Sequence, residues 1–354
     1  MKADTILLDS VSLVRSPAFS GNLFYFTTGS FDDPVFGSIE AIALLRPSIT
    51  KQPEDTIGEN STAFLKLNIS NIYGHLSDAS EFHVVELTRP WRASSWRYDS
   101  IPELGTNIVG QFTVQGSDTL NIKLSDDWTN RYRDFYFQEP TELRDSLYRN
   151  EMPGLAIIPM HDNGKLFSVN GDEATIIFQS AADTGAVEQD IGSWAVSFST
   201  ELEDGEAFGT SQIVYNTFES IMKLDFEITE ELLGSNNLSR VELVLYKDTV
   251  GMDTGGQFSR PRSETARIYY LMSHDVNYAI TTDPRFQANM REDDSSYRIN
   301  LTNFAHERLF GSSDDRRLYV VIGANDGRIL PTLLGGPNDP TRQPKLLITS
   351  IETE

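Results

Sequence analysis

The sequence predicts an all-β protein of two jelly-roll-like β-sandwich modules with a few short helices. Most of the chain reads as short alternating runs of Val, Ile, Phe, Tyr and Thr, separated by turn pairs such as Asn170-Gly171. This pattern is typical of half-buried strands, whereas helical periodicity is sparse. In addition, two sets of strand-like runs occur in the same order with similar spacing, which predicts a duplicated architecture.

The two sets can be read in chain order. The first set covers 63–69, 82–87, 121–124, 154–158 and 174–178, and the second covers 241–246, 267–271, 298–301, 318–322 and 345–348. The first residues add two more strand-like runs, 5–8 and 11–14. Because sheet edges can pair with another chain, we expect these runs to complete either a sheet of their own chain or that of a neighbour.

Helices and module boundaries follow from breaks in this pattern. Segment 141–150 predicts a short helix that opens with a Thr after Pro140, and 229–233 and 303–310 are two further candidates. The small, polar stretch 180–186 is typical of a linker. We therefore predict an N-terminal module over 1–180 and a C-terminal module over 190–354, with 194–198 as an early strand of the second module.

Composition excludes several classes of function. The 354 residues contain no Cys, which excludes disulfides, thiolate metal sites and cysteine nucleophiles. A net charge of −23 argues against nucleic acid or anionic lipid as a partner, because both are polyanions. There is no long apolar run that would span a membrane. The start has no apolar secretory segment, so we expect either a cytosolic protein or a chain that begins after a removed signal.

One motif carries a resemblance to a known family. The segment 29–37, Gly-Ser-Phe-Asp-Asp-Pro-Val-Phe-Gly, resembles a large family of Bacteroidota surface lipoproteins that is defined only as a domain of unknown function. Segments 84–88, 145–150, 154–157 and 238–243 agree with that family in order. More loosely, 87–91 with Trp96 and the closing 343–348 resemble jelly-roll domains of the DNRLRE type. The resemblance implies an extracellular or outer-membrane location and a β-sandwich fold, although the chain has no Cys to carry a lipid.

A short repeated pattern agrees with that location. Asp followed by Ser or Thr and an aliphatic residue occurs seven times and looks like the acceptor motif for O-glycosylation in the Bacteroidota envelope. The alternative is that these pairs end turns just before strands. The candidate acceptors are Thr5, Ser10, Thr56, Ser100, Thr119, Ser146 and Thr249.

Two kinds of ligand site remain open. The adjacent carboxylates Asp32-Asp33 and Asp293-Asp294 are candidates for a structural calcium site, because loop carboxylates are what Ca²⁺ prefers; the alternative is a solvated acidic loop. No cofactor is otherwise required. Aromatic residues within one module predict a stacking surface for sugars, with burial in a core as the alternative. These residues are Trp91, Trp96, Tyr98 and Trp128.

Catalytic motifs are absent from the sequence. The five His show no metal-binding spacing, and there is no Gly-x-Ser-x-Gly or phosphate-binding loop. We therefore expect a non-enzymatic structural or adhesive surface protein that acts through protein contacts and self-association, with no pocket of convergent carboxylates. The alternative is a surface glycan-binding protein. Buried indoles would favour the first, and an exposed aromatic row would favour the second.

Overall fold

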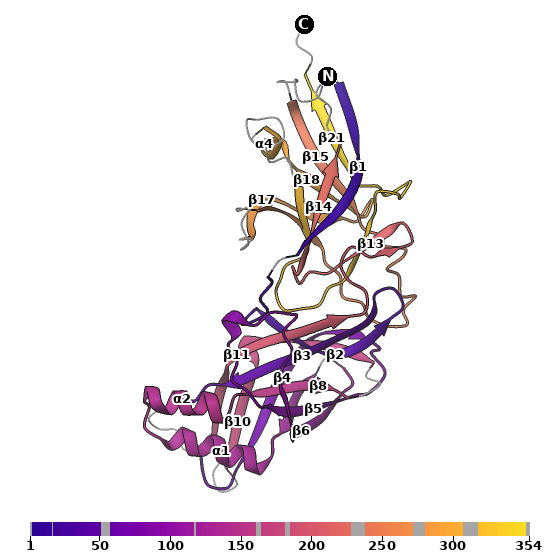
Figure 1. Cartoon of the computed structure of the whole chain (residues 1–354). Coiled ribbons are helices and arrows are strands. Elements are labelled where there is room, and N and C mark those ends of the chain that lie inside the picture. The colour runs from indigo at the N-terminus through magenta and orange to yellow at the C-terminus, as the bar shows by residue number, and fades with distance from the viewer. Residues whose placement is uncertain are drawn as a thin grey trace.

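The computed structural model describes residues 2–15, 17–50, 57–116, 118–160, 164–180, 185–227, 238–271, 280–306 and 318–351. These residues form two β-rich lobes, and the all-β prediction with few helices is confirmed. Figure 1 shows the first lobe with helices α1 and α2 at one end and the second lobe with both termini at its far tip. Hereafter the first lobe is 17–200, and the second lobe is 2–15 with 201–351.

The first lobe is an antiparallel sheet that closes on itself. Its strands pair in the order β11-β10-β4-β9-β2-β3-β8-β5-β6, with β7 on β4, and β11 also pairs with β3. Alternating residues such as Leu65 and Leu67 fill its core. The strands are β2 (Tyr25–Asp33), β3 (Gly37–Pro47), β4 (Ser61–Gly74), β5 (Ser80–Leu87), β6 (Leu104–Val114), β7 (Thr119–Lys123), β8 (Leu155–Pro159), β9 (Lys165–Asn170), β10 (Thr175–Ser180) and β11 (Ala186–Thr200).

The second lobe is a closed antiparallel barrel with a separate core. Its order is β1-β14-β19-β16-β17-β18-β15-β21, and β12, β13 and β20 form a small sheet beside it. The strands are β1 (Lys2–Arg15), β12 (Ala207–Phe208), β13 (Ser211–Val214), β14 (Ser220–Phe226), β15 (Leu238–Tyr246), β16 (Thr265–Leu271), β17 (Ile280–Arg291), β18 (Ser296–Asn300), β19 (Leu318–Ile322), β20 (Thr332–Gly335) and β21 (Lys345–Ser350).

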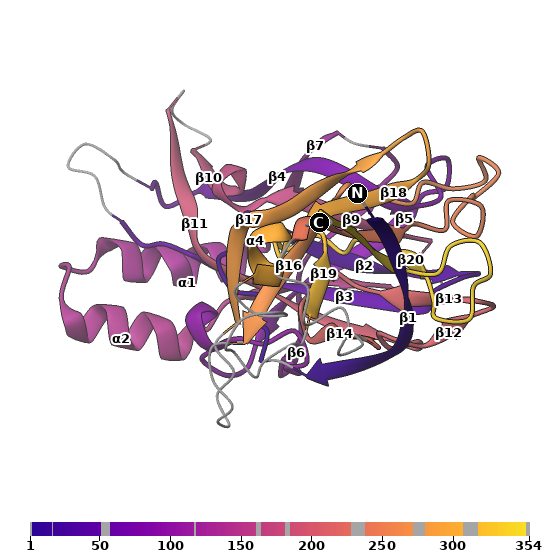
Figure 2. The same ribbon diagram turned by 90° about the horizontal axis from the view of Figure 1, so that it is seen from above.

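The helices agree with the sequence in one case and add another. The predicted helix 141–150 is α2 (Glu142–Glu151), where the Thr141 side chain accepts a hydrogen bond from the Arg144 amide as an N-cap. Helix α1 (Asp126–Phe137) was not predicted, and Figure 2 shows it beside α2, projecting to one side of the lobe. Candidate 303–310 is described only at its start, where α4 (Thr302–Phe304) lies, and 229–233 lies outside the described residues. Two single 3₁₀ turns, η1 (Ala93–Ser95) and η2 (Gly171–Glu173), complete the elements.

The lobes do not follow the predicted boundary in two places. Strand β1 belongs to the second lobe, where it lies between β14 and β21, and β11 belongs to the first lobe, where it pairs with β10 and β3. Strand β1 fits the barrel because its side chains alternate: Leu8 is buried in the barrel core while Leu7 is exposed. Strand β11 fits the first lobe because 186–200 is long enough to pair first with β10 and then with β3.

The predicted duplication is confirmed by strand pairing. In the first lobe, β10 pairs with β4, β4 with β7, and β5 with β8. In the second lobe, β21 pairs with β15, β15 with β18, and β16 with β19. These strands are the two sets read from the sequence, taken in the same order. One β-module is therefore built twice.

Candidate functional site

Asp33, a predicted calcium ligand, is instead the centre of a buried ion pair between the lobes. Its carboxylate accepts hydrogen bonds from Arg260 at 2.7 Å (Nη2 to Oδ1) and 2.8 Å (Nε to Oδ2). The Tyr73 hydroxyl donates to Oδ2 at 2.7 Å, and the Val35 amide donates to Oδ1 at 2.8 Å. Both carboxylate oxygens are thus occupied by protein donors. The calcium prediction is wrong for Asp33, because a turn and a guanidinium use the oxygens that a metal would need.

The other three acidic candidates also lack the arrangement of a metal site. Asp32 is exposed on β2, and Asp293 lies 3.6 Å from the Arg291 guanidinium. Asp294 accepts from Ser296 and Arg298, and these hydrogen bonds lower the pKa of Asp294 to about 2. Within the described residues, no group of three or more His, Cys, Asp or Glu side chains is placed to hold a metal ion.

The predicted aromatic surface does not exist as an exposed row. Trp91, Tyr98 and Trp128 are 5%, 1% and 2% exposed. Trp128 stacks on Tyr132, with ring centroids 5.4 Å apart, and Trp96 is half-buried and donates to the Ser197 hydroxyl. These rings fill cores, so they offer no continuous face on which a sugar could stack. The stacking prediction for them is wrong, and burial, its stated alternative, is observed.

The candidate glycosylation acceptors differ in exposure. The exposed acceptors, which are open to modification, are Thr5, Ser10, Thr119 and Ser146. Ser100 and Thr249 are half-buried, and Thr56 lies outside the described residues.

A cleft of about 250 Å³ where β1 ends against the first lobe contains carboxylates, which the sequence did not lead us to expect. Burial raises the pKa of Asp204 to about 8, against a 2.6 Å hydrogen bond from the Tyr215 amide that favours the ionised form. Burial and the nearby Asp99 carboxylate raise the pKa of Glu219 to about 7. Asp204 therefore holds its proton at neutral pH while Glu219 titrates there. No sequence spacing marks this pair, because different loops bring the two residues together.

Two exposed ion pairs flank the cleft. Arg15 at the end of β1 lies 2.7 Å from Glu203, and Arg97 lies 2.8 Å from Asp99. Each pair joins residues of a single lobe, since Arg15 and Glu203 belong to the second lobe and Arg97 and Asp99 to the first.

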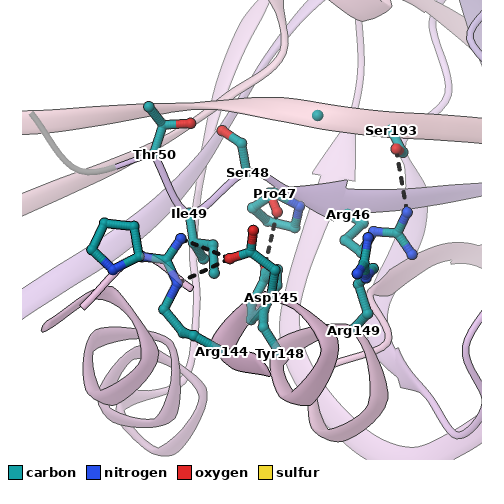
Figure 3. A pocket seen from close by; sticks show the side chains of 12 residues that line it. Arg46, Pro47, Ser48, Ile49, Thr50, Arg144, Asp145, Tyr148, Arg149 and Ser193 are labelled. Atoms are coloured by element: carbon teal, nitrogen blue, oxygen red, sulfur yellow. Dashed lines mark hydrogen bonds and ion pairs between the residues drawn. The ribbon is translucent and has the colours of Figure 1, made fainter. Parts of the chain in front are cut away.

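A larger pocket, of about 410 Å³, lies between the end of β3, helix α2 and β11 (Figure 3). The Tyr148 hydroxyl donates to the Pro47 carbonyl at 2.7 Å, which fixes α2 against β3. Arg144 is buried and donates through Nε and Nη2 to one oxygen of Asp145, at 3.0 and 2.7 Å. This pair is neutral as a unit.

The other two arginines of the pocket are not neutralised in this way. Arg46 donates to the Trp91 carbonyl at 2.9 Å and lies over the Trp91 ring, 5.2 Å from its centroid. Arg149 is exposed and has no hydrogen bond or ion pair to any described residue. Figure 3 shows Arg46 and Arg149 close together, and burial with the repulsion of Arg149 lowers the pKa of Arg46, although Tyr148 acts in the opposite direction.

Such a pair of guanidinium groups can hold an oxyanion. The donors of an arginine side chain form a fork that matches the oxygens of carboxylate, sulfate and phosphate groups. Two positive charges without a paired carboxylate are a local exception in a protein whose net charge is −23. The hydroxyls of Ser48, Thr50 and Ser193 line the same pocket. Arg149 entered the sequence argument only as part of the predicted helix 141–150 and of the family resemblance. Arg46 was not singled out, since its partner group comes from a distant helix.

The comparisons with known proteins add no relative. No protein-family model matches this chain, and no curated protein matches it. Within the described residues, no helix is both long and apolar enough to cross a membrane.

Proposed function

We propose that this chain is a non-enzymatic structural or adhesive protein, displayed at the outer surface of a Gram-negative cell, that acts through contacts with other proteins and self-associates. The observation that carries the proposal is the junction between its lobes, which is built as a rigid joint. Location rests on the family resemblance of 29–37 and on the repeated Asp-Ser/Thr pattern.

The joint has a continuous apolar core. Side chains of the second lobe, including Tyr215, Phe258 and Leu333, belong to the same buried cluster as the core of the first lobe. Phe258 also contacts Phe31, with ring centroids 4.9 Å apart. Hinged two-domain proteins instead have polar interfaces that allow the domains to move. A shared core favours a spacer of fixed shape.

Main-chain contacts close the joint on two sides. Gly74 forms an isolated antiparallel bridge with Ser259, and the Tyr25 amide donates to the Asp326 carbonyl at 2.7 Å. The Thr27 hydroxyl donates to the Gly327 carbonyl at 2.8 Å. Backbone contacts of this kind hold the two lobes in one relative orientation, as a structural subunit requires.

The test is the size and shape of the protein, by electron microscopy and by light scattering at matched salt. Filaments, rings or defined oligomers would support the proposal. A dispersed monomer at all concentrations, with no binding to envelope proteins, would remove it.

The pocket of Arg46 and Arg149 favours one form of the glycan-binding alternative, in which the ligand is an acidic sugar. The guanidinium pair would hold the anionic group, and the Ser and Thr hydroxyls around it would hold ring hydroxyls. The buried indoles exclude Trp91 and Trp128 as its stacking surface.

Calorimetric titration with glucuronate, glucose 6-sulfate and glucose separates the outcomes. Binding of the two anions but not of glucose, lost in Arg149→Gln, would support an acidic-sugar site. The matched control is Arg262→Gln, which removes the same charge from an exposed position of the second lobe. Equal affinity for glucose, or no binding at all, would exclude it.

A further inference from the structure

The eight barrel strands of the second lobe correspond to eight strands of the first lobe, with one exception in connectivity. In the first lobe, β11 pairs with β10 and with β3 and so closes the sheet. In the second lobe the equivalent neighbours are β21 and β14, and the strand between them is β1. The closing strand of the first lobe follows β10 in the chain, whereas that of the second lobe comes from before the first lobe.

The match between β11 and β1 extends to their pairing. The first part of β11 (186–190) pairs with β10, and its second part (191–200) pairs with β3. Likewise, the first part of β1 (2–7) pairs with β21, and its second part (8–15) pairs with β14. Each strand has a register shift where it passes from one partner to the other. The second lobe therefore has a place for a closing strand that its own contiguous sequence does not fill.

The contacts of β1 do not require it to come from the same chain. They consist mainly of antiparallel backbone pairs and of one deeply buried side chain, Leu8, which is 1% exposed. The Leu8 amide donates to the Pro344 carbonyl at 2.9 Å, and the Gln343 side chain donates to the Leu8 carbonyl at 2.8 Å. The β1 of another copy would make the same bonds.

The segment after β1 is fixed to the first lobe rather than to the barrel. Ser20 is fully buried, and its hydroxyl donates to the Val196 carbonyl at 2.6 Å, while its amide donates to the Trp96 carbonyl. Only the few residues between Arg15 and this anchor have to change course for β1 to leave its own barrel. Short connections between a terminal element and its domain favour exchange between copies.

We infer that β1 is an exchangeable strand, and that copies of this chain associate when the β1 of one copy closes the barrel of another between β14 and β21. The inference rests on the proposed function and names its partner, a second copy, and the contact surface. Reciprocal exchange gives a closed pair, and one-way exchange gives an open chain.

The absence of native Cys permits a direct test. Ser12 lies opposite Lys223 across β1 and β14, so Ser12→Cys and Lys223→Cys can form a disulfide only when these strands pair. Chains that carry one substitution each are mixed, unfolded, refolded together and oxidised, and the products are separated without reductant. Exchange predicts a covalent heterodimer. Thr5→Cys with Leu347→Cys repeats the test on β21 if the first pair does not fold.

The matched control uses the equivalent strand of the first lobe. Ser199 lies opposite Glu40 across β11 and β3, and β11 continues from β10, so Ser199→Cys and Glu40→Cys on separate chains should give no heterodimer. A covalent heterodimer that forms with the β1 cysteine pairs but not with the control pair on β11 and β3 supports exchange. Oligomers that form without any β1 cross-link overturn the exchange but leave the proposed function standing. Monomer without cross-link overturns the exchange, and it overturns the proposed function as well when the chain also binds no envelope protein.

Discussion

The guanidinium of Arg260 and the carboxylate of Asp33 form a two-point ion pair in which the side chains are 2% and 0% exposed. Asp33 is the last residue of β2, next to the turn that leads to β3, and Arg260 lies in the loop before β16 in the other lobe. The Arg260 guanidinium also lies over the rings of Phe36 and Phe258, at 5.2 and 5.1 Å from their centroids. The motif that carries the family resemblance is thus one of the parts of the first lobe that contact the second.

Asp33→Asn is therefore expected to destabilise the chain strongly. The change leaves the Arg260 charge buried without its counterion, which typically costs about 3–5 kcal/mol. Urea unfolding measures the loss. The adjacent exposed Asp32→Asn removes the same charge and should change the free energy of unfolding by less than about 0.5 kcal/mol. Equal effects of the two changes would show that the ion pair does not hold the lobes.

Closure of the barrel by β1 gives a second prediction, on two neighbouring leucines. Leu8 is 1% exposed and Leu7 is 52% exposed, since adjacent strand residues point to opposite faces. Leu8→Asp buries a charge in an apolar core and should release β1, so that protease cleaves the chain near Arg15. Leu7→Asp adds the same charge and should leave cleavage unchanged. Rapid cleavage of both variants, or of neither, would contradict the placement of β1.

Helix α1 gives a third prediction. Trp128 is buried in a stack with Tyr132, whereas Phe137 on the same helix is 44% exposed. Trp128→Ala should lower the free energy of unfolding by about 3–5 kcal/mol, as expected for a large buried aromatic side chain. Phe137→Ala should cost less than about 1 kcal/mol. Urea denaturation compares the two, and a small effect of Trp128→Ala would restore it as a candidate for surface binding.

Much of the fold follows from local pattern, and the site does not. Strand 318–322 and the N-cap at Thr141 were predicted because a short apolar run and a capping Thr are features of a few adjacent residues. Helix α1 was missed although Trp128, Tyr132 and Tyr136 repeat every fourth residue, a helical spacing that an aromatic-rich β-sequence obscures.

Residues that meet across the fold leave no local signal. Asp33 and Arg260 are 227 positions apart, so the acidic pair 32–33 looked like a solvated loop or a calcium site. The same holds for Arg46 with Arg149, and for the assignment of β1 to the far lobe. In each case the partner is selected by tertiary packing, which neither spacing nor composition encodes.

The last prediction concerns pH and the cleft of Asp204. The pKa of this carboxyl is raised from its ordinary value of 3.8 to about 8, so the folded chain binds a proton more tightly than the unfolded chain does. The resulting stability is fully present below about pH 4 and is lost as the pH rises toward about 8, by at most about 1.4 kcal/mol per pH unit.

Asp204→Asn keeps an oxygen to accept the Tyr215 amide but cannot ionise, so it should match the wild type near pH 4 and exceed it in stability at pH 8. Glu219 titrates in both proteins, so the difference between them isolates Asp204. Urea unfolding across this range measures that difference. The exposed Asp172→Asn, which removes one surface carboxylate, is the matched control for the change of residue type. A difference between Asp204→Asn and wild type that does not change with pH would mean that the Asp204 carboxyl is ionised in the folded chain, and that the cleft is open to water.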